Sequence, residues 1–154
     1  MDKCQAVMTG FSDLDKLTGG LSGGQLILVG GRPAMGKSTF AMNIADHVLQ
    51  QGKGGVVVFS IEMAEDQYIR RCMELGLGTG QRERLHIVEQ IPETTPEEIK
   101  KKLLALREKM TIGLVVIDYL QLMGCGEKKN TADFRCDPFI IQRSLLQRRS
   151  SQVR

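Results

Sequence analysis

The chain has 154 residues, of which 42% are hydrophobic, and a formal net charge of +3. This length suits one domain with a single core and excludes a large multidomain motor. No apolar run approaches the ~20 residues of a membrane-spanning helix. The N-terminus, Met1-Asp2-Lys3-Cys4, also lacks the apolar segment of a signal peptide. We therefore expect a cytoplasmic protein with no membrane partner.

The spacing of cysteines and histidines argues against a zinc site or a disulfide framework. No two cysteines form a C-x-x-C pair, and the two histidines lie far apart without an adjacent ligand partner. We expect reduced thiols, and imidazoles that are solvated or packed. The residues are Cys4, Cys72, Cys125 and Cys136, with His47 and His86.

The positive charge is concentrated at the C-terminal end. Residues 1–126 carry 14 Lys and Arg against 15 Asp and Glu, whereas residues 127–154 carry seven against three. Two interpretations remain open for this basic end: a contact with the phosphates of a nucleic acid, or a solvated terminal segment.

The first 25 residues predict a short helix followed by a loop. Apolar residues recur at positions 11, 14, 17 and 21, and turn glycines follow them. The next four residues, 26–29 (Leu-Ile-Leu-Val), form an apolar run that is typical of a buried parallel strand.

This strand leads into a phosphate-binding loop. Gly31, Gly36, Lys37 and Ser38 fill the pattern G-x-x-x-x-G-K-[ST]. The glycines permit backbone angles that let successive N–H groups turn towards a phosphate. The following helix adds the N–H groups and positive dipole of its first turn. Lys37 is expected to meet the β- and γ-phosphates, and the Ser38 hydroxyl to complete a Mg²⁺ shell that is mostly water.

The nucleotide-binding segment therefore comprises nine consecutive residues: Gly31, Arg32, Pro33, Ala34, Met35, Gly36, Lys37, Ser38 and Thr39. The alternative is a glycine-rich surface turn. A helical stripe of apolar residues behind the loop favours phosphate binding instead, because it predicts the packed helix that such a loop needs. The stripe consists of Ala41, Ile44, Ala45, Val48 and Leu49.

Glu62 follows a second predicted strand, the β-branched run at residues 56–60. Ligands of open α/β sheets bind at the carboxyl ends of the strands, where a carboxylate can orient or deprotonate a water molecule. Glu62 also lies near the start of a predicted helix through Ile69 and Cys72, where an acidic residue stabilises the helix dipole. Spacing alone does not decide between a catalytic and a helix-terminal Glu62.

The second half of the chain continues the alternation of strands and helices. Residues 85–88 predict a short strand. Thr95, Pro96 and Glu98 form a helix start with a capping box. A third predicted strand at 111–117 ends just before Asp118, which follows four hydrophobic residues. This is the position that a Walker B aspartate needs, because such an aspartate holds Mg²⁺ through water. Alternating strands and helices predict an α/β fold with parallel pairing.

Together these blocks resemble the motor domain of DnaB-type replicative DNA helicases, which are ring-shaped RecA-like P-loop NTPases. The resemblance covers roughly residues 8–77 and 85–123. It rests on Thr9-Gly10-Phe11, Gly19-Gly20-Leu21, the loop from Gly31 to Ser38 with Arg32-Pro33-Ala34-Met35 inside it, Phe59-Ser-Ile-Glu-Met63 and Asp118-Tyr-Leu-Gln-Leu-Met123.

The resemblance implies a function for each motif residue. Lys37 becomes the phosphate lysine, Ser38 and Asp118 the magnesium residues, and Glu62 the catalytic glutamate. The implied activity is hydrolysis of Mg-ATP coupled to movement along single-stranded DNA during replication. The implied partners are further copies of the chain in a ring, single-stranded DNA and other replication proteins.

The chain departs from this family after residue 123. We find no later strand with a Ser-Gln sensor, no DNA-binding loops and no arginine finger there, and no N-terminal primase-contacting domain precedes the motor. We therefore expect a partial RecA-like core at 1–123, incomplete on its C-terminal side, and a divergent basic tail at 124–154. The tail is interpreted either as a basic amphipathic helix or as unrelated sequence. We hypothesise that residues 139–149 pack against the sheet gap beside the P-loop strand.

Three functional hypotheses follow. The first is an ATP-dependent replicative DNA helicase. The second is a truncated nucleotide-binding module that holds Mg-ATP without helicase activity. A RecA-like recombination or clock-type ATPase shares the P-loop but fits the blocks at 59–63 and 118–123 less well.

Overall fold

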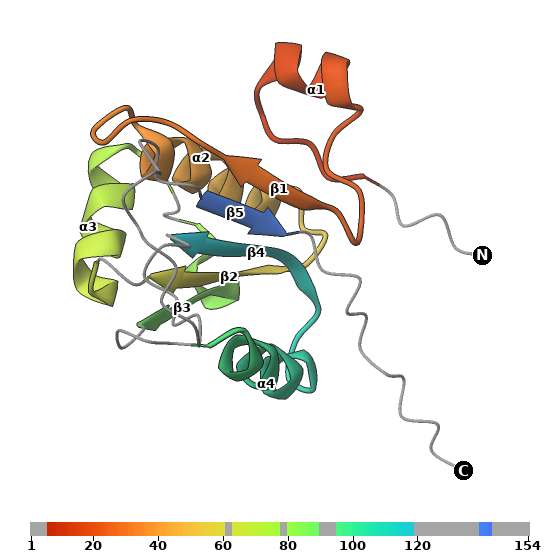
Figure 1. The fold of residues 1–154 in the computed structure, drawn as a ribbon, viewed down its shortest axis with the longest axis vertical. Helices are drawn as coiled ribbons and strands as arrows, with labels where there is room; N and C mark the ends of the chain where they lie inside the picture. The colour runs from red at the N-terminus through yellow and green to blue at the C-terminus, as the bar shows by residue number, and fades with distance from the viewer. Residues whose placement is uncertain (1–5, 61–62, 78–79, 90–94, 119–138, 143–154) are drawn as a thin grey trace, which may run out of the picture.

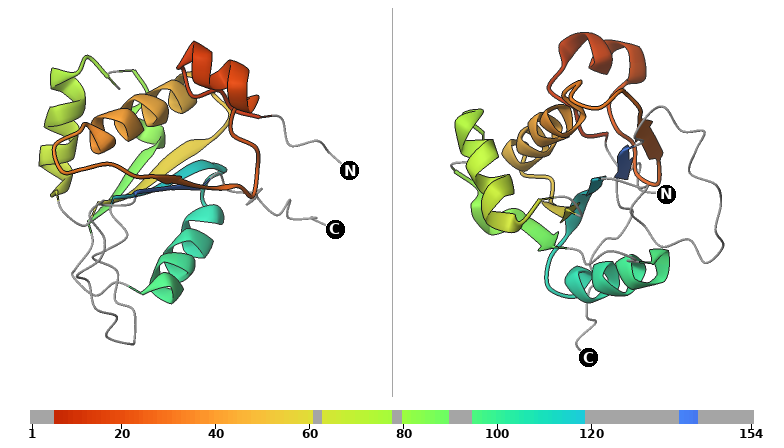
Figure 2. Two further views of the ribbon diagram at one scale, coloured as in Figure 1. Left: turned by 45° about the horizontal axis from the view of Figure 1, so that its top comes forward. Right: turned by 60° about the vertical axis from the view of Figure 1, so that its left-hand side comes forward.

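The computed structural model describes residues 6–60, 63–77, 80–89, 95–118 and 139–142 (Figure 1). These residues form three layers: a five-stranded sheet with helices on both faces. Helices α2 (Lys37–Gln50) and α3 (Glu65–Glu74) cover one face, and α4 (Pro96–Arg107) covers the other (Figure 2). The α/β class predicted from the sequence is confirmed.

The strand order in the sheet is β1-β5-β4-β2-β3. Strand β2 pairs in parallel with both β3 and β4, whereas β5 runs antiparallel to β1 and β4. The strands are β1 (Leu26–Val29), β2 (Gly55–Ser60), β3 (Leu85–Glu89), β4 (Ile112–Asp118) and β5 (Phe139–Gln142). Because β1 and β4 both run against β5, they point in the same direction, and their carboxyl ends lie at the same edge of the sheet.

The core consists of two apolar clusters on opposite faces of the sheet. Residues of β2 and β4 alternate between them, as the two-residue period of a strand requires. Val58 and Val116 belong to the cluster beneath α2 and α3, while Val57 and Val115 belong to the cluster beneath α4. Both strands are buried along their whole length, which explains their continuous apolar sequence.

Helix α4 begins where the sequence predicts. Thr95 accepts a hydrogen bond from the Glu98 backbone N–H, and the Glu98 carboxylate accepts one from the Thr95 N–H, which completes the capping box. Ile99 and Leu103 face the sheet, and Lys100 to Lys102 are exposed. Among the described residues, no helix is both long enough and apolar enough to cross a membrane.

The N-terminal segment is fastened to α2. It contains a short α-helix, α1 (Ser12–Thr18), which confirms the short helix predicted from the sequence. The Asp15 carboxylate accepts hydrogen bonds from the Thr9 hydroxyl and from the N–H groups of Thr9 and Gly10. Burial alone would raise the pKa of Asp15, but these hydrogen bonds outweigh it and lower the pKa. The Phe11 ring, just before α1, stacks on Phe40 of α2 with 4.9 Å between centroids.

Two predictions about the sheet are wrong. Strand β1 is an edge strand with an antiparallel neighbour, not a buried parallel strand, and Leu26 and Leu28 are each 60% exposed. Within the tail, residues 139–142 form a strand, not part of an amphipathic helix. Both errors share one cause: strand pairing is set by distant segments, which local sequence periodicity does not report.

The hypothesis that the tail fills the gap beside the P-loop strand is confirmed for residues 139–142. These four residues lie between β1 and β4 and pair with both (Figure 1). Residues 143–149, which the hypothesis also included, lie outside the described residues. Strand β5 therefore connects the P-loop strand to the rest of the sheet.

Replacing Ile140 with proline tests this connection. In an internal strand each backbone N–H belongs to a hydrogen-bonded ladder, and proline has no N–H to donate. Ile140 is opposite Leu28 in β1 and Ile117 in β4. We expect Ile140→Pro to lower the free energy of unfolding by about 1–3 kcal/mol, measured by urea denaturation. Ile140→Val keeps the N–H and is the control; equal stability of the two variants would contradict the β5 pairing.

Candidate nucleotide-binding site

The predicted phosphate loop joins β1 to α2 at the carboxyl edge of the sheet. Gly36 is the N-cap of α2 and lies in the left-handed region, with φ 82°. Ala34 also has positive φ, 62°, which is unusual for a residue with a side chain. Gly31, in contrast, is outside this region. The sequence prediction of special backbone angles therefore holds for Gly36 and not for Gly31.

Lys37 lies back over the loop that precedes it. Its Nζ donates to the carbonyl oxygens of Gly31 at 3.0 Å and Arg32 at 3.1 Å. A Cβ added to Gly31 would lie 3.5 Å from Lys37 Cγ, so the lysine stem passes in contact distance of this glycine. The positive charge of Lys37 is therefore held at the loop, where it can attract the oxygen atoms of an anionic ligand.

The first turn of α2 supplies backbone donors beside this charge. Phe40 N–H donates to Gly36 O at 2.8 Å, the first hydrogen bond of the helix ladder. The N–H groups that precede such a bond have no acceptor within their helix, and together with the helix dipole they favour an anion. Ser38 and Thr39 follow Lys37 in this turn and are half-buried.

An open cleft of about 660 Å³ lies over the loop. It is large enough for a nucleotide, since ligand sites of this kind commonly measure ~300–1,000 Å³. Its lining combines the loop backbone with the Lys37 charge and the Phe40 ring. The lining residues are Val29, Gly30, Gly31, Arg32, Met35, Gly36, Lys37 and Phe40.

Asp118 is the last residue of β4 and is only 4% exposed. It is in register with Ser60, the last residue of β2, which is 2% exposed. The Ser60 hydroxyl donates to Met63 O at 2.6 Å and so closes the turn after β2. Buried acids are rare and need a compensating interaction. Asp118 thus lies at the same sheet edge as the phosphate loop, as the Walker B assignment requires.

These groups fit a magnesium nucleotide. The loop offers one fixed ammonium, a helix N-terminus and a glycine N-cap, all suited to phosphate oxygens. Ser38 and Asp118 offer the oxygen donors that Mg²⁺ prefers, and few protein donors are needed because the ion keeps several waters. Within the described part of the chain, no group of three or more His, Cys, Asp or Glu residues forms another type of metal centre.

The structure places most, but not all, of the predicted site residues. Arg32, Pro33, Ala34 and Met35 form the exposed outer turn of the loop. Glu62 lies outside the described residues, so its assignment as catalytic glutamate stays a prediction. The sequence analysis did not identify Phe40 as a residue that lines the cleft. Its position three residues after Lys37, in the first turn of the helix, is the sequence feature that could have indicated it.

Comparison with known proteins agrees with the sequence resemblance. A profile of the DnaB-like helicase C-terminal domain matches residues 6–80. This segment is therefore similar to DnaB-like helicase C-terminal domains.

Individual relatives extend the match. The replicative DNA helicase DnaB of Geobacillus stearothermophilus is 32% identical over 147 residues, and the match covers 80% of this chain and 32% of the relative. The replicative DNA helicase DnaC of Bacillus subtilis is 31% identical over 149 residues, covering 80% and 33%. A probable replicative DNA helicase of Trieres chinensis is 34% identical, covering 80% and 32%. The chain therefore spans about a third of the length of these relatives.

Substitution of Gly36 separates backbone strain from nucleotide binding. Nothing lies within 4 Å of a Cβ placed there, so Gly36→Ala changes only the cost of the left-handed conformation, about 1–2 kcal/mol. Gly19 caps α1 at φ 71° with equally open surroundings. We expect both alanine variants to lower the melting temperature, but only Gly36→Ala to weaken Mg-ATP binding, measured by calorimetry. Equal affinities in the two variants would contradict the loop assignment.

Proposed function

We propose that the chain binds and hydrolyses Mg-ATP as the nucleotide-binding core of a replicative DNA helicase. The observation that carries this proposal is the geometry of Lys37. Its ammonium is fixed over the Gly31–Gly36 loop at the start of α2, and β4 ends in the buried Asp118 at the same sheet edge. The match of residues 6–80 to the profile of DnaB-like helicase C-terminal domains and the names of the relatives support the same function.

Each residue has a defined task in this proposal. Lys37 exchanges the Gly31 and Arg32 carbonyls for β- and γ-phosphate oxygens, and the first turn of α2 donates N–H groups to them. Ser38 and Asp118 would hold Mg²⁺, and the ion would supply positive charge beside the phosphates. Glu62, by resemblance, orients the attacking water.

The wider helicase activity belongs to the same proposal. Movement along single-stranded DNA, assembly into a ring of identical chains, contacts with replication proteins and a cytoplasmic location follow from the family resemblance and the sequence. The division of the chain into a core at 1–123 and a basic tail at 124–154 also belongs to this proposal, and strand β5 of the tail pairs within the sheet of the core.

A nucleotide-binding module without helicase activity is the second candidate. It is favoured by one specific observation: β5 comes from the tail and runs antiparallel in the sheet beside the P-loop strand. The resemblance instead implies a later strand with a Ser-Gln sensor. Hydrolysis without that sensor and without an arginine finger is expected to be slow.

Lys37→Ala tests the nucleotide site. We expect loss of tight Mg-ATP binding, by at least tenfold in Kd, because the loop loses the ammonium charge that is proposed to contact the phosphates. Binding is measured by isothermal titration calorimetry. Lys101→Ala is the control, since Lys101 is exposed on α4. An affinity for Mg-ATP within a few-fold of the parent would overturn the proposal.

Turnover measurements with and without single-stranded DNA separate the two candidates. ATP hydrolysis that DNA stimulates supports the helicase, whereas Mg-ATP binding without stimulation supports the module.

We also expect Glu62→Gln to spare binding and slow hydrolysis by about 10²-fold or more, because it removes a group that acts on the attacking water. An unchanged rate would return Glu62 to a helix-terminal role.

A further inference from the structure

The cleft over the phosphate loop has an apolar part that phosphates do not need. Its volume is about 660 Å³, and its two cationic lining residues are Arg32 and Lys37. Phe40 lies one helical turn beyond Lys37 and is the one aromatic side chain among the described residues that line the cleft. A hydrocarbon ring cannot hydrogen-bond phosphate oxygens, so this part of the cleft suits another part of a ligand.

Phe11 holds the Phe40 ring from a distant part of the sequence. The two rings are stacked, with 4.9 Å between their centroids and 28° between their planes. Phe40 is half-buried, and Phe11 is 38% exposed. The stack restricts rotation of the Phe40 side chain while the ring still lines the cleft. The cleft therefore contains a flat apolar surface in a fixed place.

The position of Asp118 indicates which end of a nucleotide meets this ring. Asp118 ends β4, which is separated from β1 by β5. Phe11 directly precedes α1, and Figure 1 shows α1 on the side of β1 away from β5. In a magnesium nucleotide the metal is bound to the phosphates. A triphosphate whose magnesium end faces Asp118 therefore extends its nucleoside towards Phe40 and Phe11.

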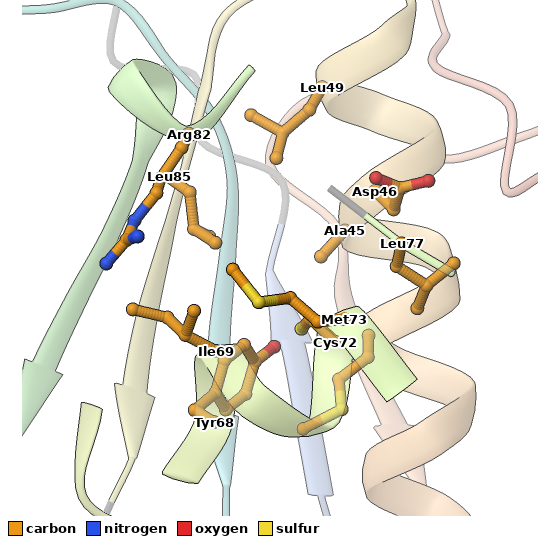
Figure 3. Close-up of a pocket in the computed structure, with 11 residues that line it drawn as sticks. Ala45, Asp46, Leu49, Tyr68, Ile69, Cys72, Met73, Leu77, Arg82 and Leu85 are labelled. Carbon is orange, nitrogen blue, oxygen red and sulfur yellow. The ribbon is translucent and has the colours of Figure 1, made fainter. Parts of the chain in front are cut away.

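Two other hollows beside α2 are less suited to a nucleotide. The cavity between α2 and α3, which Figure 3 shows with its lining side chains, measures about 30 Å³ and has room for water molecules only. The groove between α1 and β1 measures about 310 Å³, but none of the described residues that line it is charged, so it offers no cation to phosphates. The cleft over the loop combines cationic groups with an aromatic ring.

We propose that Phe40, held by Phe11, is the surface on which the base of a bound nucleoside triphosphate stacks. This inference rests on the proposed function and adds recognition of the nucleoside to that of the phosphates. Every nucleobase has a π face, so an aromatic ring binds all of them through the same contact. The stack adds affinity for a nucleotide without selecting among the bases.

Phe40→Leu removes the aromatic face and keeps an apolar side chain. The two probes are Mg-ATP and magnesium tripolyphosphate, which has the phosphates but no nucleoside. We expect the Kd of Mg-ATP to rise about fivefold or more, because loss of a base–aromatic stack has an effect of this order. We expect the Kd of tripolyphosphate to stay unchanged. Both are measured by isothermal titration calorimetry.

Fluorescence reports the same contact directly. The chain contains no tryptophan, so Phe40→Trp introduces a single indole at the proposed stacking surface. A base that stacks on an indole quenches its emission. We expect Mg-ATP and Mg-GTP to quench the emission and tripolyphosphate to leave it unchanged. Emission that does not change when Mg-ATP binds would contradict the stack.

Phe59→Leu is the matched control. It makes the same substitution in a ring that is fully buried in the cluster beneath α4, on the opposite face of the sheet from α2. We expect it to lower the melting temperature, because it leaves a gap in the core. The ratio of the two Kd values should stay that of the parent chain.

Two results for Phe40→Leu overturn the inference. The first is a rise of both Kd values by the same factor, which would mean that the ring only supports the loop. The second is an unchanged Kd of Mg-ATP. If Lys37→Ala loses Mg-ATP binding, either result rejects the role of Phe40 alone. If the parent chain binds neither probe, both proposals fail.

Discussion

The backbone pairing of β5 with β1 and β4 is the constraint on which the candidate site depends. Strand β1 carries the phosphate loop and has β5 as its neighbour in the sheet, while β4 carries Asp118. The four residues of β5 therefore set the separation between the two halves of the site. Because β5 runs against both neighbours, β1 and β4 end at the same edge, where the loop with Lys37 begins and where Asp118 lies.

The two halves differ in how they are supported. Asp118 stands on β4, which is buried over its full length between helices on both faces. The loop stands on an edge strand whose Leu26 and Leu28 are exposed, and it gains further support from α2 and from the Phe11–Phe40 stack. The half of the candidate site that contains Asp118 is thus deeply buried, and the half that contains the loop is held by fewer and more local contacts.

The sequence predicts what depends on local chemistry. The capping box at Thr95 and the buried run of β2 require particular residues at fixed spacing, and both are found as predicted. In the loop around Lys37, the special backbone angle is found at Gly36 and not at Gly31, and phosphate binding stays a prediction. It does not predict the exposure of β1 or the direction of β5, because strand neighbours are chosen by packing between segments more than 100 residues apart.

Amide hydrogen exchange on β1 of the parent chain tests the central claim most directly. If β5 joins the P-loop strand to the sheet, the paired amides of residues 26–29 are protected together with those of β5 and are exposed in the same opening event. Exchange of β1 amides at the rate of an unpaired segment, while β2 and β4 stay protected, would contradict the account.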